Sequence, residues 1–441
     1  MTNRSNEHLG NHRIPGDVSH GEKMPVIRPL SLRKNFSWTL LGNVVYYLCQ
    51  WGILSCLNKM EGTNASGIFI LGLSISSPIY IFLEFHLKSL LATDVKERFR
   101  FECYFGSRLF SIFVSQVLVV VIAISCYSDM EKRLIIVFLG VAFGAQALGD
   151  IFYGLFQKYE RLDITSHSNM IKGISNVTIT IIIFWLTRSV LIVVFGLIIS
   201  RFGVWLFYDY RKAKQLLMEY CGELNYKLLP DFSWKPQLTL AWMGLPLGIT
   251  AWCVSMNANI PRYFLAEREL GIFGSMAYVT TVGWMIITAL SQSASPRLAK
   301  SIASGSVRNY LKLMTKLTLF GGFIGFCCVM GTWLAGPILL RILYTEEFVQ
   351  YNFLFVIIIF SAAISYAATF MRHGVIAARI LFIQPFLYSF ITLAVLVTCY
   401  YCIPKYGFYG AAYAMVVAST FQFLFAVLLN ICVVRIMIKR Q

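Results

Sequence analysis

The chain has 441 residues, of which 57% are hydrophobic and only 13% are charged. A soluble domain carries roughly 25% charged residues, so this composition excludes an ordinary water-soluble protein and indicates one surrounded mostly by lipid. The net charge of +17 would suggest nucleic-acid binding in a soluble protein. Here, however, no basic run is interleaved with aromatic residues in a segment long enough to fold alone. We therefore expect no nucleic-acid partner and assign the positive charge to the loops of a membrane protein.

The first 30 residues are polar, with several Gly, Pro and His, which predicts a disordered cytoplasmic tail. The first apolar run is long and lacks the small-residue cleavage pattern of a signal peptide. The rest of the chain predicts an all-α polytopic membrane protein, because apolar runs recur at the length of about 20 residues that a membrane span needs. About twelve spans are predicted, at 36–57, 66–90, 105–126, 134–157, 169–187, 189–208, 238–257, 272–295, 311–335, 350–371, 380–402 and 407–434.

The longest polar connection, at 209–236, follows the sixth span and divides the chain into two halves of six spans. Lys and Arg are concentrated in alternate connections, which places both termini in the cytoplasm by the positive-inside rule. The predicted parts are a cytoplasmic tail at 1–30, an N-terminal six-helix lobe at 31–208, a cytoplasmic linker at 209–237, a C-terminal six-helix lobe at 238–434 and a cytoplasmic end at 435–441.

A short internal repeat accompanies this division. Ser66-Gly67-Ile68-Phe69 opens the second span, and Leu270-Gly271-Ile272-Phe273 opens the eighth. Six spans per half return the chain to the same side of the membrane, so both halves would insert in the same orientation. Such halves are parallel repeats related by an axis along the membrane normal.

Two spans carry polar side chains along one helical face, at spacings of three or four residues. These stripes occupy equivalent spans of the two halves, so we expect both to line a hydrated central cavity. The alternative is hydrogen bonding between helices that holds the bundle together. The stripes consist of Asn35, Thr39, Asn43, Tyr46, Tyr47 and Gln50 in the first span and of Thr281, Trp284, Thr288, Gln292 and Ser295 in the eighth.

Ionisable side chains in the spans are candidate functional groups, because a charge at mid-membrane costs about 2.5–3.5 kcal/mol on insertion scales. Glu84 and Lys88 lie four residues apart in the second predicted span and could form an ion pair there. Alternatively, Lys88 extends to the lipid headgroups. Positive charges are ordinary at span ends, where Arg262, Arg297 and Arg372 lie. An amphiphile with an anionic head would nevertheless need such cations at the mouth of a cavity.

Proline and glycine interrupt several spans. The second contains Pro78, the seventh contains Gly244-Leu245-Pro246-Leu247-Gly248, and the eleventh contains Pro385. Proline removes a backbone hydrogen bond and kinks a helix, so the seventh span is expected to bend. The bend could act as a hinge between rocking halves or as a static packing device.

Several catalytic and nucleotide-binding patterns are missing from the sequence. It contains no G-x-x-x-x-G-K-[ST] loop, no G-x-S-x-G and no H-E-x-x-H, which are signatures of phosphate-binding loops and of two hydrolase classes. We expect no cofactor, no metal site and no enzymatic activity. The energy source is expected to be an ion gradient, the membrane potential or the gradient of the substrate itself.

Four stretches carry a resemblance to a known family. They are Leu32-Arg33-Lys34-Asn35-Phe36-Ser37-Trp38; Ala92-Thr93-Asp94 with Phe101 and Tyr104; Asn259-Ile260-Pro261-Arg262-Tyr263-Phe264 with Leu270-Gly271-Ile272-Phe273; and Ser291-Gln292-Ser293-Ala294-Ser295-Pro296-Arg297-Leu298-Ala299. Together they resemble bacterial O-antigen and capsular oligosaccharide flippases (Wzx-like) of the multidrug/oligosaccharidyl-lipid/polysaccharide exporter superfamily. The resemblance extends over most of the chain, from about residue 31 to 434.

The resemblance implies two six-helix lobes around a V-shaped central cavity that opens alternately to each side. The implied function is translocation of undecaprenyl-diphosphate-linked oligosaccharide repeat units from the cytoplasmic to the periplasmic leaflet, for O-antigen, capsule or exopolysaccharide biosynthesis. The implied location is the bacterial inner membrane. The implied partners are the lipid-linked oligosaccharide and membrane lipids, with other membrane proteins of polysaccharide assembly as candidates.

In such flippases the first, second, seventh and eighth spans line the cavity, and its cations meet the diphosphate. Carried over by position, Lys88 and Arg297 are the candidates for diphosphate contact, with Arg262 toward the outer side. Lys88 stands where the family is expected to have arginine at least as often, and lysine offers a point charge instead of a bidentate contact. The residues implied to meet the sugar or its water are Asn43, Tyr47, Gln50, Thr288 and Gln292.

Two other functions stay open at this point. A drug/cation antiporter of the same superfamily would need buried acidic residues for ion coupling, and the candidates are Glu84 and Asp150, which both lie toward cytoplasmic ends of spans. A membrane-embedded glycan polymerase or transferase would need catalytic groups on a sizeable outer loop. The longest outer loop predicted here, at about 258–271, is short.

Overall fold

The computed structural model describes residues 30–94, 97–221, 228–378 and 383–439. The predicted tail at 1–30 lies outside these ranges apart from its last residue. Within the described ranges the regular secondary structure is helical, and twelve helices are long and apolar enough to cross a membrane. The prediction of an all-α protein with about twelve spans is therefore confirmed.

The first half of the chain forms six spans and two shorter helices. A π-helical turn at Trp205–Asp209 continues α7 into α8 without a break, so helix occupies much of the segment predicted as a linker. The elements are α1 (Leu32–Glu61), α2 (Thr63–Leu83), α3 (Leu87–Thr93), α4 (Phe101–Cys126), α5 (Met130–Lys158), α6 (Leu162–Thr187), α7 (Val190–Val204) and α8 (Tyr210–Cys221).

The second half forms six further spans and one short helix between the third and fourth of them. Its spans include the two longest helices of the described chain, α10 and α11, at 37 residues each. The elements are α9 (Trp234–Tyr263), α10 (Glu267–Ala303), α11 (Val307–Leu343), α12 (Glu346–Val349), α13 (Asn352–Ala377), α14 (Gln384–Tyr406) and α15 (Phe408–Lys439).

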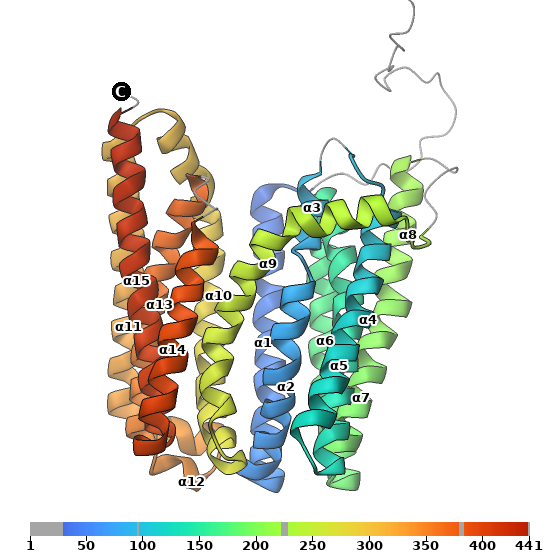
Figure 1. Cartoon of the computed structure of the whole chain (residues 1–441), viewed down its shortest axis with the longest axis vertical. Helices are drawn as coiled ribbons and strands as arrows, with labels where there is room; N and C mark the ends of the chain where they lie inside the picture. Colours follow the sequence, from blue (N-terminus) through green and yellow to red (C-terminus); the bar gives the residue numbers. More distant parts are fainter. Residues whose placement is uncertain (1–29, 95–96, 222–227, 379–382, 440–441) are drawn as a thin grey trace, which may run out of the picture.

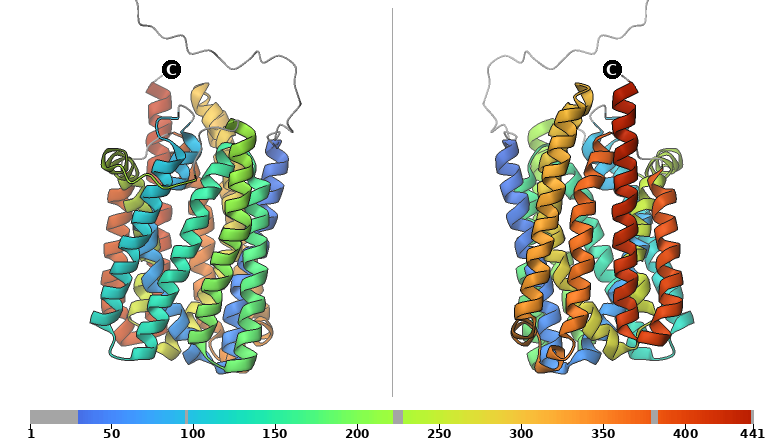
Figure 2. Two further views of the ribbon diagram at one scale, coloured as in Figure 1. Left: turned by 90° about the vertical axis from the view of Figure 1, so that its right-hand side faces the viewer. Right: turned by 90° about the vertical axis from the view of Figure 1, so that its left-hand side faces the viewer.

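The spans stand side by side as one bundle (Figures 1 and 2). In Figure 1, α11 and α13–α15 form one flank, α4–α8 form the other, and α1, α2, α9 and α10 lie between them. We call α1–α8 the N-lobe and α9–α15 the C-lobe. The end of the bundle at which α1 begins and α15 ends is called the terminal side, and the end at which α12 lies is called the opposite side.

The outward faces of the spans are apolar. Trp185 is 72% exposed and Phe386 is 76% exposed, and many other large apolar side chains are exposed on the same faces. In water, so much contiguous apolar surface would drive aggregation. A bilayer covers it, which fits helices that span a membrane.

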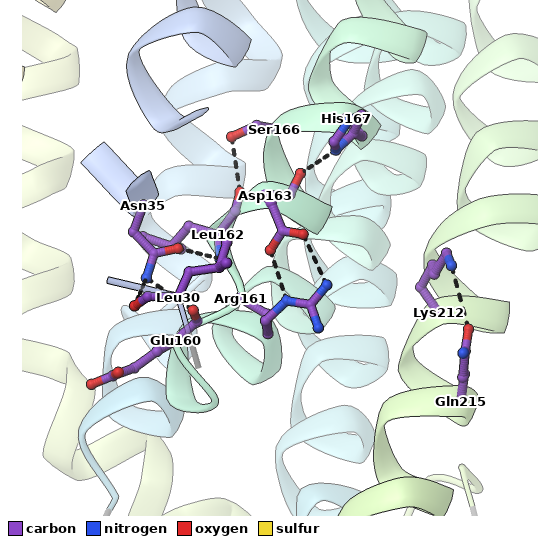
Figure 3. Close-up of polar contacts among 10 residues, drawn as sticks. All are labelled: Leu30, Asn35, Glu160, Arg161, Leu162, Asp163, Ser166, His167, Lys212 and Gln215. Carbon is purple, nitrogen blue, oxygen red and sulfur yellow. Dashed lines mark hydrogen bonds and ion pairs between the residues drawn. The ribbon is translucent and has the colours of Figure 1, made fainter. Parts of the chain in front are cut away.

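Asn35 joins the start of α1 to the connection between α5 and α6 (Figure 3). Its Nδ2 donates to the carbonyl oxygens of Glu160 at 2.9 Å and Leu30 at 3.3 Å, and its Oδ1 accepts from the backbone N–H of Leu162 at 3.1 Å. The N-terminus of α6 has no side-chain cap of its own, so Asn35 supplies the acceptor that an N-cap residue usually provides. Asn35 therefore holds helices together at the terminal side, whereas the sequence grouped it with a cavity stripe.

The seventh span bends, as its glycines and proline predict. Figure 1 shows the first part of α9 lying across the terminal side of the N-lobe and the rest descending toward the opposite side. Pro246 has no N–H for the helix ladder, and a Cβ on Gly244 would lie 2.0 Å from the carbonyl oxygen of Phe85. The bend is thus fitted against the end of α2. Its use as a hinge stays a prediction.

Side-chain hydrogen bonds join the two lobes toward the opposite side. Asn58 of α1 is buried, and its Nδ2 donates to Ser275 of α10 at 2.8 Å. Nearby, the indole N–H of Trp51 donates to the Tyr344 hydroxyl at 3.0 Å. The last third of α1 is therefore fastened to the C-lobe at this end of the bundle.

The two glycines of the internal repeat let α2 and α10 cross in direct backbone contact. A Cβ on Gly67 would lie 1.9 Å from the carbonyl oxygen of Glu267, and a Cβ on Gly271 would lie 1.9 Å from that of Thr63. Thr63 and Glu267 are the first residues of α2 and α10, so each repeat glycine accommodates the first turn of the other lobe. Small residues allow such close helix packing in membranes, and the reciprocal contact agrees with paired halves.

Gly271→Ala should lower the melting temperature of the purified protein, because the added Cβ must push the backbones of α2 and α10 apart. Overpacking of this kind costs about 1–3 kcal/mol. The matched control is Gly331→Ala in α11, where a Cβ would meet no atom within 4 Å and alanine is the better helix former. Thermal unfolding in detergent measures both variants. Equal melting temperatures for the two variants would contradict the close crossing.

Candidate functional site

Six ionisable side chains gather toward the terminal side of the N-lobe, and we call them the N-lobe charge cluster. Three are positive and three are negative, so the cluster is balanced when all are ionised. The members come from six different elements: Glu84 follows α2, Lys88 lies on α3, Arg108 on α4, Asp150 on α5, Lys172 on α6 and Asp209 in the π-helical turn.

Lys172 and Asp209 form the most buried ion pair of the described chain. Lys172 Nζ lies 2.8 Å from Asp209 Oδ2, and both side chains are 0% exposed. The same ammonium donates to the Tyr153 hydroxyl at 2.7 Å, and that hydroxyl lies 2.8 Å from Ser168 Oγ. A Cβ on Gly149 would lie 2.5 Å from Lys172 Nζ, so the glycine leaves the room that the pair occupies.

Glu84 pairs with Arg108, whereas the sequence offered Lys88 as its partner. The Arg108 guanidinium lies 3.2 Å from the Glu84 carboxylate and is 2% exposed. The second predicted span is interrupted here, because α2 ends at Leu83 and both Phe85 and His86 have left-handed backbone conformations, with φ of 46° and 50°. Glu84 and Lys88 are therefore not on one helical face.

Asp150 and Lys88 complete the N-lobe charge cluster. The Asp150 carboxylate accepts a hydrogen bond from Gln146 at 3.3 Å and interacts electrostatically with Lys88, Glu84, Arg108 and Lys172. Lys88 Nζ lies 5.5 Å from the centre of the Tyr153 ring, and Lys172 Nζ lies 4.8 Å from the same ring centre. The structure thus brings Lys88, Glu84 and Asp150, three of the residues singled out from the sequence, into one network.

The polar stripe of α1 lies beside this network. Asn43, Tyr46, Tyr47 and Gln50 are all half-buried, and the two tyrosine rings meet edge to face at 5.6 Å. Tyr46 and Tyr47 both interact electrostatically with Asp150. Gln50 Nε2 is buried without a hydrogen-bond partner among the described residues. The middle of α1 therefore presents polar groups to the interior of the bundle.

Arg262 lies far from the N-lobe charge cluster, at the end of α9 on the opposite side. Its Nη1 donates to Asn259 Oδ1 at 3.0 Å and to Ser74 Oγ of α2 at 3.4 Å, while its Nε is buried without a partner in the described chain. The neighbouring Tyr263 hydroxyl donates to the Ser74 carbonyl. Arg262 is thus an interior cation at the junction of the two lobes.

The remaining residues singled out on the eighth span are less connected. Arg297 is exposed near the terminal end of α10, and Thr288 donates to the Trp284 carbonyl of its own helix at 2.8 Å. The Gln292 side chain lies outside the described residues. The structure therefore does not bring Lys88, Arg262 and Arg297 together at a single position.

A cavity with several polar side chains in its wall lies in the C-lobe. Its volume is about 260 Å³, and its walls come from α9, α10, α13, α14 and α15. Thr281 and Trp284 of the predicted stripe on the eighth span line it. Among its described lining residues Arg372 is the one charged side chain. The two lobes thus differ inside: the N-lobe holds a cluster of paired charges, and the C-lobe holds a cavity lined by one cation.

This architecture is shared with proteins of known structure or function. The chain is 24% identical over 396 residues to the capsular polysaccharide biosynthesis protein CapF of Staphylococcus aureus, covering 88% of this chain and 96% of that protein. Its structure resembles the lipid II flippase MurJ in an inward closed conformation, with a TM-score of 0.67 and 11% identity over 89% of this chain and 86% of that one.

A multidrug resistance MATE family transporter of the MOP superfamily, in an inward-facing conformation, matches with a TM-score of 0.61 and 14% identity, covering 90% of this chain and 95% of that chain. The chain has the MOP transporter fold. No family model matches the chain, and CapF is a distant homologue. The resemblance seen in the sequence is supported at this level.

Within the MOP fold, the buried ion pair of the N-lobe was missed by the sequence analysis. The sequence analysis did not single out Lys172, which lies within α6. The signal was present as a four-residue spacing, because Ser168, Lys172, Asn176 and Thr180 follow one face of α6 and are all 0% exposed. Such a polar stripe indicates a helix face directed into the bundle.

Asp209→Asn should destabilise the MOP-fold chain strongly, because it leaves the Lys172 ammonium buried without a counter-charge. Breaking a buried pair from one side costs about 3–5 kcal/mol. The yield of folded protein on size-exclusion chromatography and the melting temperature measure the effect.

The double variant Lys172→Met with Asp209→Asn is the control for Asp209→Asn, since it removes both charges. Replacing both members of a buried pair by uncharged groups can be close to neutral, so the double variant should be more stable than Asp209→Asn alone. A single variant as stable as the unmodified protein would show that the pair is dispensable for folding.

Proposed function

We propose that the chain is a flippase that translocates undecaprenyl-diphosphate-linked oligosaccharide repeat units from the cytoplasmic to the periplasmic leaflet. It would do so by alternating access, for O-antigen, capsule or exopolysaccharide biosynthesis. The distant relation to CapF supports a role in making a surface polysaccharide, since it covers 96% of that protein. The MurJ-like fold supports a lipid-linked substrate, because MurJ is a lipid II flippase.

The observation that carries this proposal is a set of three interior arginines without acidic partners. Arg201 of α7 is 5% exposed and donates to the Ala142 carbonyl at 3.1 Å, with no ion pair to the residues that the structure describes. Arg262 donates to neutral oxygens, and Arg372 forms no ion pair with the described residues. Tyr278 of α10 interacts electrostatically with Arg201 and Arg262, so both face the interior shared by the lobes.

An interior cation without a counter-charge destabilises the protein when no substrate is bound. This arrangement suits a site at which the substrate itself supplies the negative charge. Moving a bare diphosphate through hydrocarbon would cost on the order of tens of kcal/mol by Born solvation. Arginine offers bidentate hydrogen bonds to phosphate oxygens and would remove much of that barrier. In this proposal Lys88 and Arg297 meet the diphosphate near the terminal side, and Arg262 meets it near the opposite side.

A drug/cation antiporter is less well supported by the same interior. Such a transporter needs acidic groups that can release a cation, yet Glu84 is paired with Arg108 at 3.2 Å. Asp150 interacts electrostatically with three cations, Lys88, Arg108 and Lys172, and with one anion, Glu84, so it is not an isolated acidic group. Electrostatic complementarity in this interior therefore favours an anionic substrate.

In this proposal the two ends of the bundle face opposite sides of the membrane. The terminal side would face the cytoplasm of a bacterium, in keeping with the concentration of Lys and Arg on that side in the sequence. The inter-lobe hydrogen bonds lie toward the opposite side, which would then be periplasmic. The conformation described here would accordingly be the one that receives substrate from the cytoplasmic leaflet.

Deleting the gene should make undecaprenyl-linked repeat units accumulate in the cytoplasmic leaflet and should remove the surface glycan. Thin-layer chromatography of lipid-linked sugars and immunoblotting of the surface polymer measure these effects in a strain without a second flippase. Normal surface glycan in that strain would overturn the proposal.

Complementation of the deletion strain tests the interior arginines. Arg262→Gln should restore surface glycan poorly at unchanged protein level, because it removes an interior cation, while Arg262→Lys should restore more. The control is Arg268→Gln, on the same lobe, whose side chain is 62% exposed and paired with Glu347. Full complementation by Arg262→Gln would remove this residue from the substrate path.

A further inference from the structure

We infer that the C-lobe cavity is a binding site for an acidic sugar, held by its carboxylate against Arg372. The inference rests on the proposed function, because it names a chemical class for part of the transported glycan. It concerns residues that the sequence analysis treated as ordinary charges at a span end. The site would be separate from any diphosphate contact at Lys88, Arg297 or Arg262.

Two side chains in the cavity wall have unused hydrogen-bonding capacity. Asn257 of α9 is 4% exposed, and neither its amide nitrogen nor its amide oxygen has a partner among the described residues. Arg372 of α13 likewise has a buried Nε without a partner. In the proposed bound state both side chains turn toward the cavity and meet the ligand, because buried polar groups are almost always satisfied in folded proteins.

Three hydroxyl groups of the wall already use their protons within their own helices. Thr280, Thr369 and Ser419 each donate their hydroxyl proton to a carbonyl of their own helix, at 2.6, 2.8 and 2.9 Å. Their oxygen lone pairs stay available to the cavity. A ligand rich in hydroxyl groups can donate to these oxygens, and carbohydrates are such ligands.

The single positive charge in the cavity wall favours some anions over others. Arg372 is its one cation and no acidic residue lines the described walls, so a ligand with a single negative charge is matched and a diphosphate is not. The planar guanidinium binds a carboxylate in bidentate fashion. Aromatic side chains of Trp284 and Tyr388 also line the cavity and offer apolar surface to the faces of a sugar ring.

The size of the cavity agrees with a single sugar unit. Its volume of about 260 Å³ lies just below the usual range of small-molecule pockets, roughly 300–1,000 Å³. Arg372, Tyr388 and Gln422 also line a smaller adjoining cavity, so the cation lies where the two spaces meet. A substituted sugar would have room to extend from the larger space.

Equilibrium binding to the purified full-length chain in lipid nanodiscs tests the inference. Glucuronate, glucose and inorganic pyrophosphate are the probes, and ligand-observed NMR measures their dissociation constants. Glucuronate should bind, glucose should bind more weakly, and pyrophosphate should not compete with glucuronate. Arg372→Gln should weaken glucuronate binding about tenfold or more, as expected for loss of a charge-assisted hydrogen bond, and should leave glucose binding unchanged.

Three further variants sharpen the result. Asn257→Asp should also weaken glucuronate binding, because the new carboxylate in the cavity wall repels the glucuronate carboxylate. Arg372→Lys should give an intermediate affinity, because the charge remains and the bidentate geometry is lost. Arg308→Gln, on an exposed position of α11, is the matched control and should bind glucuronate normally.

Arg372→Gln should also melt at or above the temperature of the unmodified protein, because it removes a half-buried cation without an acidic partner. This measurement keeps a loss of binding distinct from a loss of folding.

Glucuronate binding that is absent, or that is unaffected by Arg372→Gln, would overturn the inference. Pyrophosphate binding that depends on Arg372, without glucuronate binding, would also overturn it and would make the cavity a diphosphate site. The proposed function fails separately: normal surface glycan in the deletion strain would reject the flippase while Arg372-dependent glucuronate binding would still stand. Accumulated lipid-linked sugar without glucuronate binding would reject only the sugar site.

Discussion

A charge inside an apolar bundle must be neutralised by a neighbouring group or by something that enters, and the two lobes meet this constraint in different ways. The N-lobe neutralises most of its buried charges internally, through Lys172 with Asp209 and Arg108 with Glu84, and Arg201 is its exception. The C-lobe leaves Arg372 without an acidic partner beside a cavity. Because buried ions are tolerated only when they are paired, the first arrangement is suited to holding a lobe rigid and the second to receiving an anion.

The contacts between the two lobes also differ between the two ends of the bundle. The reciprocal backbone contact of Gly67 and Gly271 and the hydrogen bond from Asn58 to Ser275 fasten the lobes toward the opposite side. Toward the terminal side, α9 crosses from one lobe to the other and bends at Gly244 to Gly248 (Figure 1). A bundle fastened at one end and linked by a bent helix at the other is the geometry in which two rigid lobes could rock, the shear and hinge motion typical of transporters.

Much of this fold could be predicted from the sequence, because span length and glycine–proline chemistry are local properties. The twelve spans, the bend of the seventh and the paired glycines were all visible in the printed residues. The partner of Glu84 was not, since nothing local marks the left-handed Phe85 and His86 that end α2 before Lys88. Arg372 looked like an ordinary charge at a span end, and only the packing of five helices around the cavity suggests the role proposed for it. Side-chain partners and cavities depend on tertiary structure, which periodicity alone does not specify.

The central claim is that the surplus positive charge inside this MOP-fold chain exists to carry an anionic head group. The most direct measurement is flipping in proteoliposomes of two fluorescent glycolipids with the same sugar and the same tail, one linked through diphosphate and the other through a neutral ether. The account predicts that the diphosphate-linked lipid is translocated and that the neutral lipid is translocated far more slowly. Equal rates for the two lipids would contradict it.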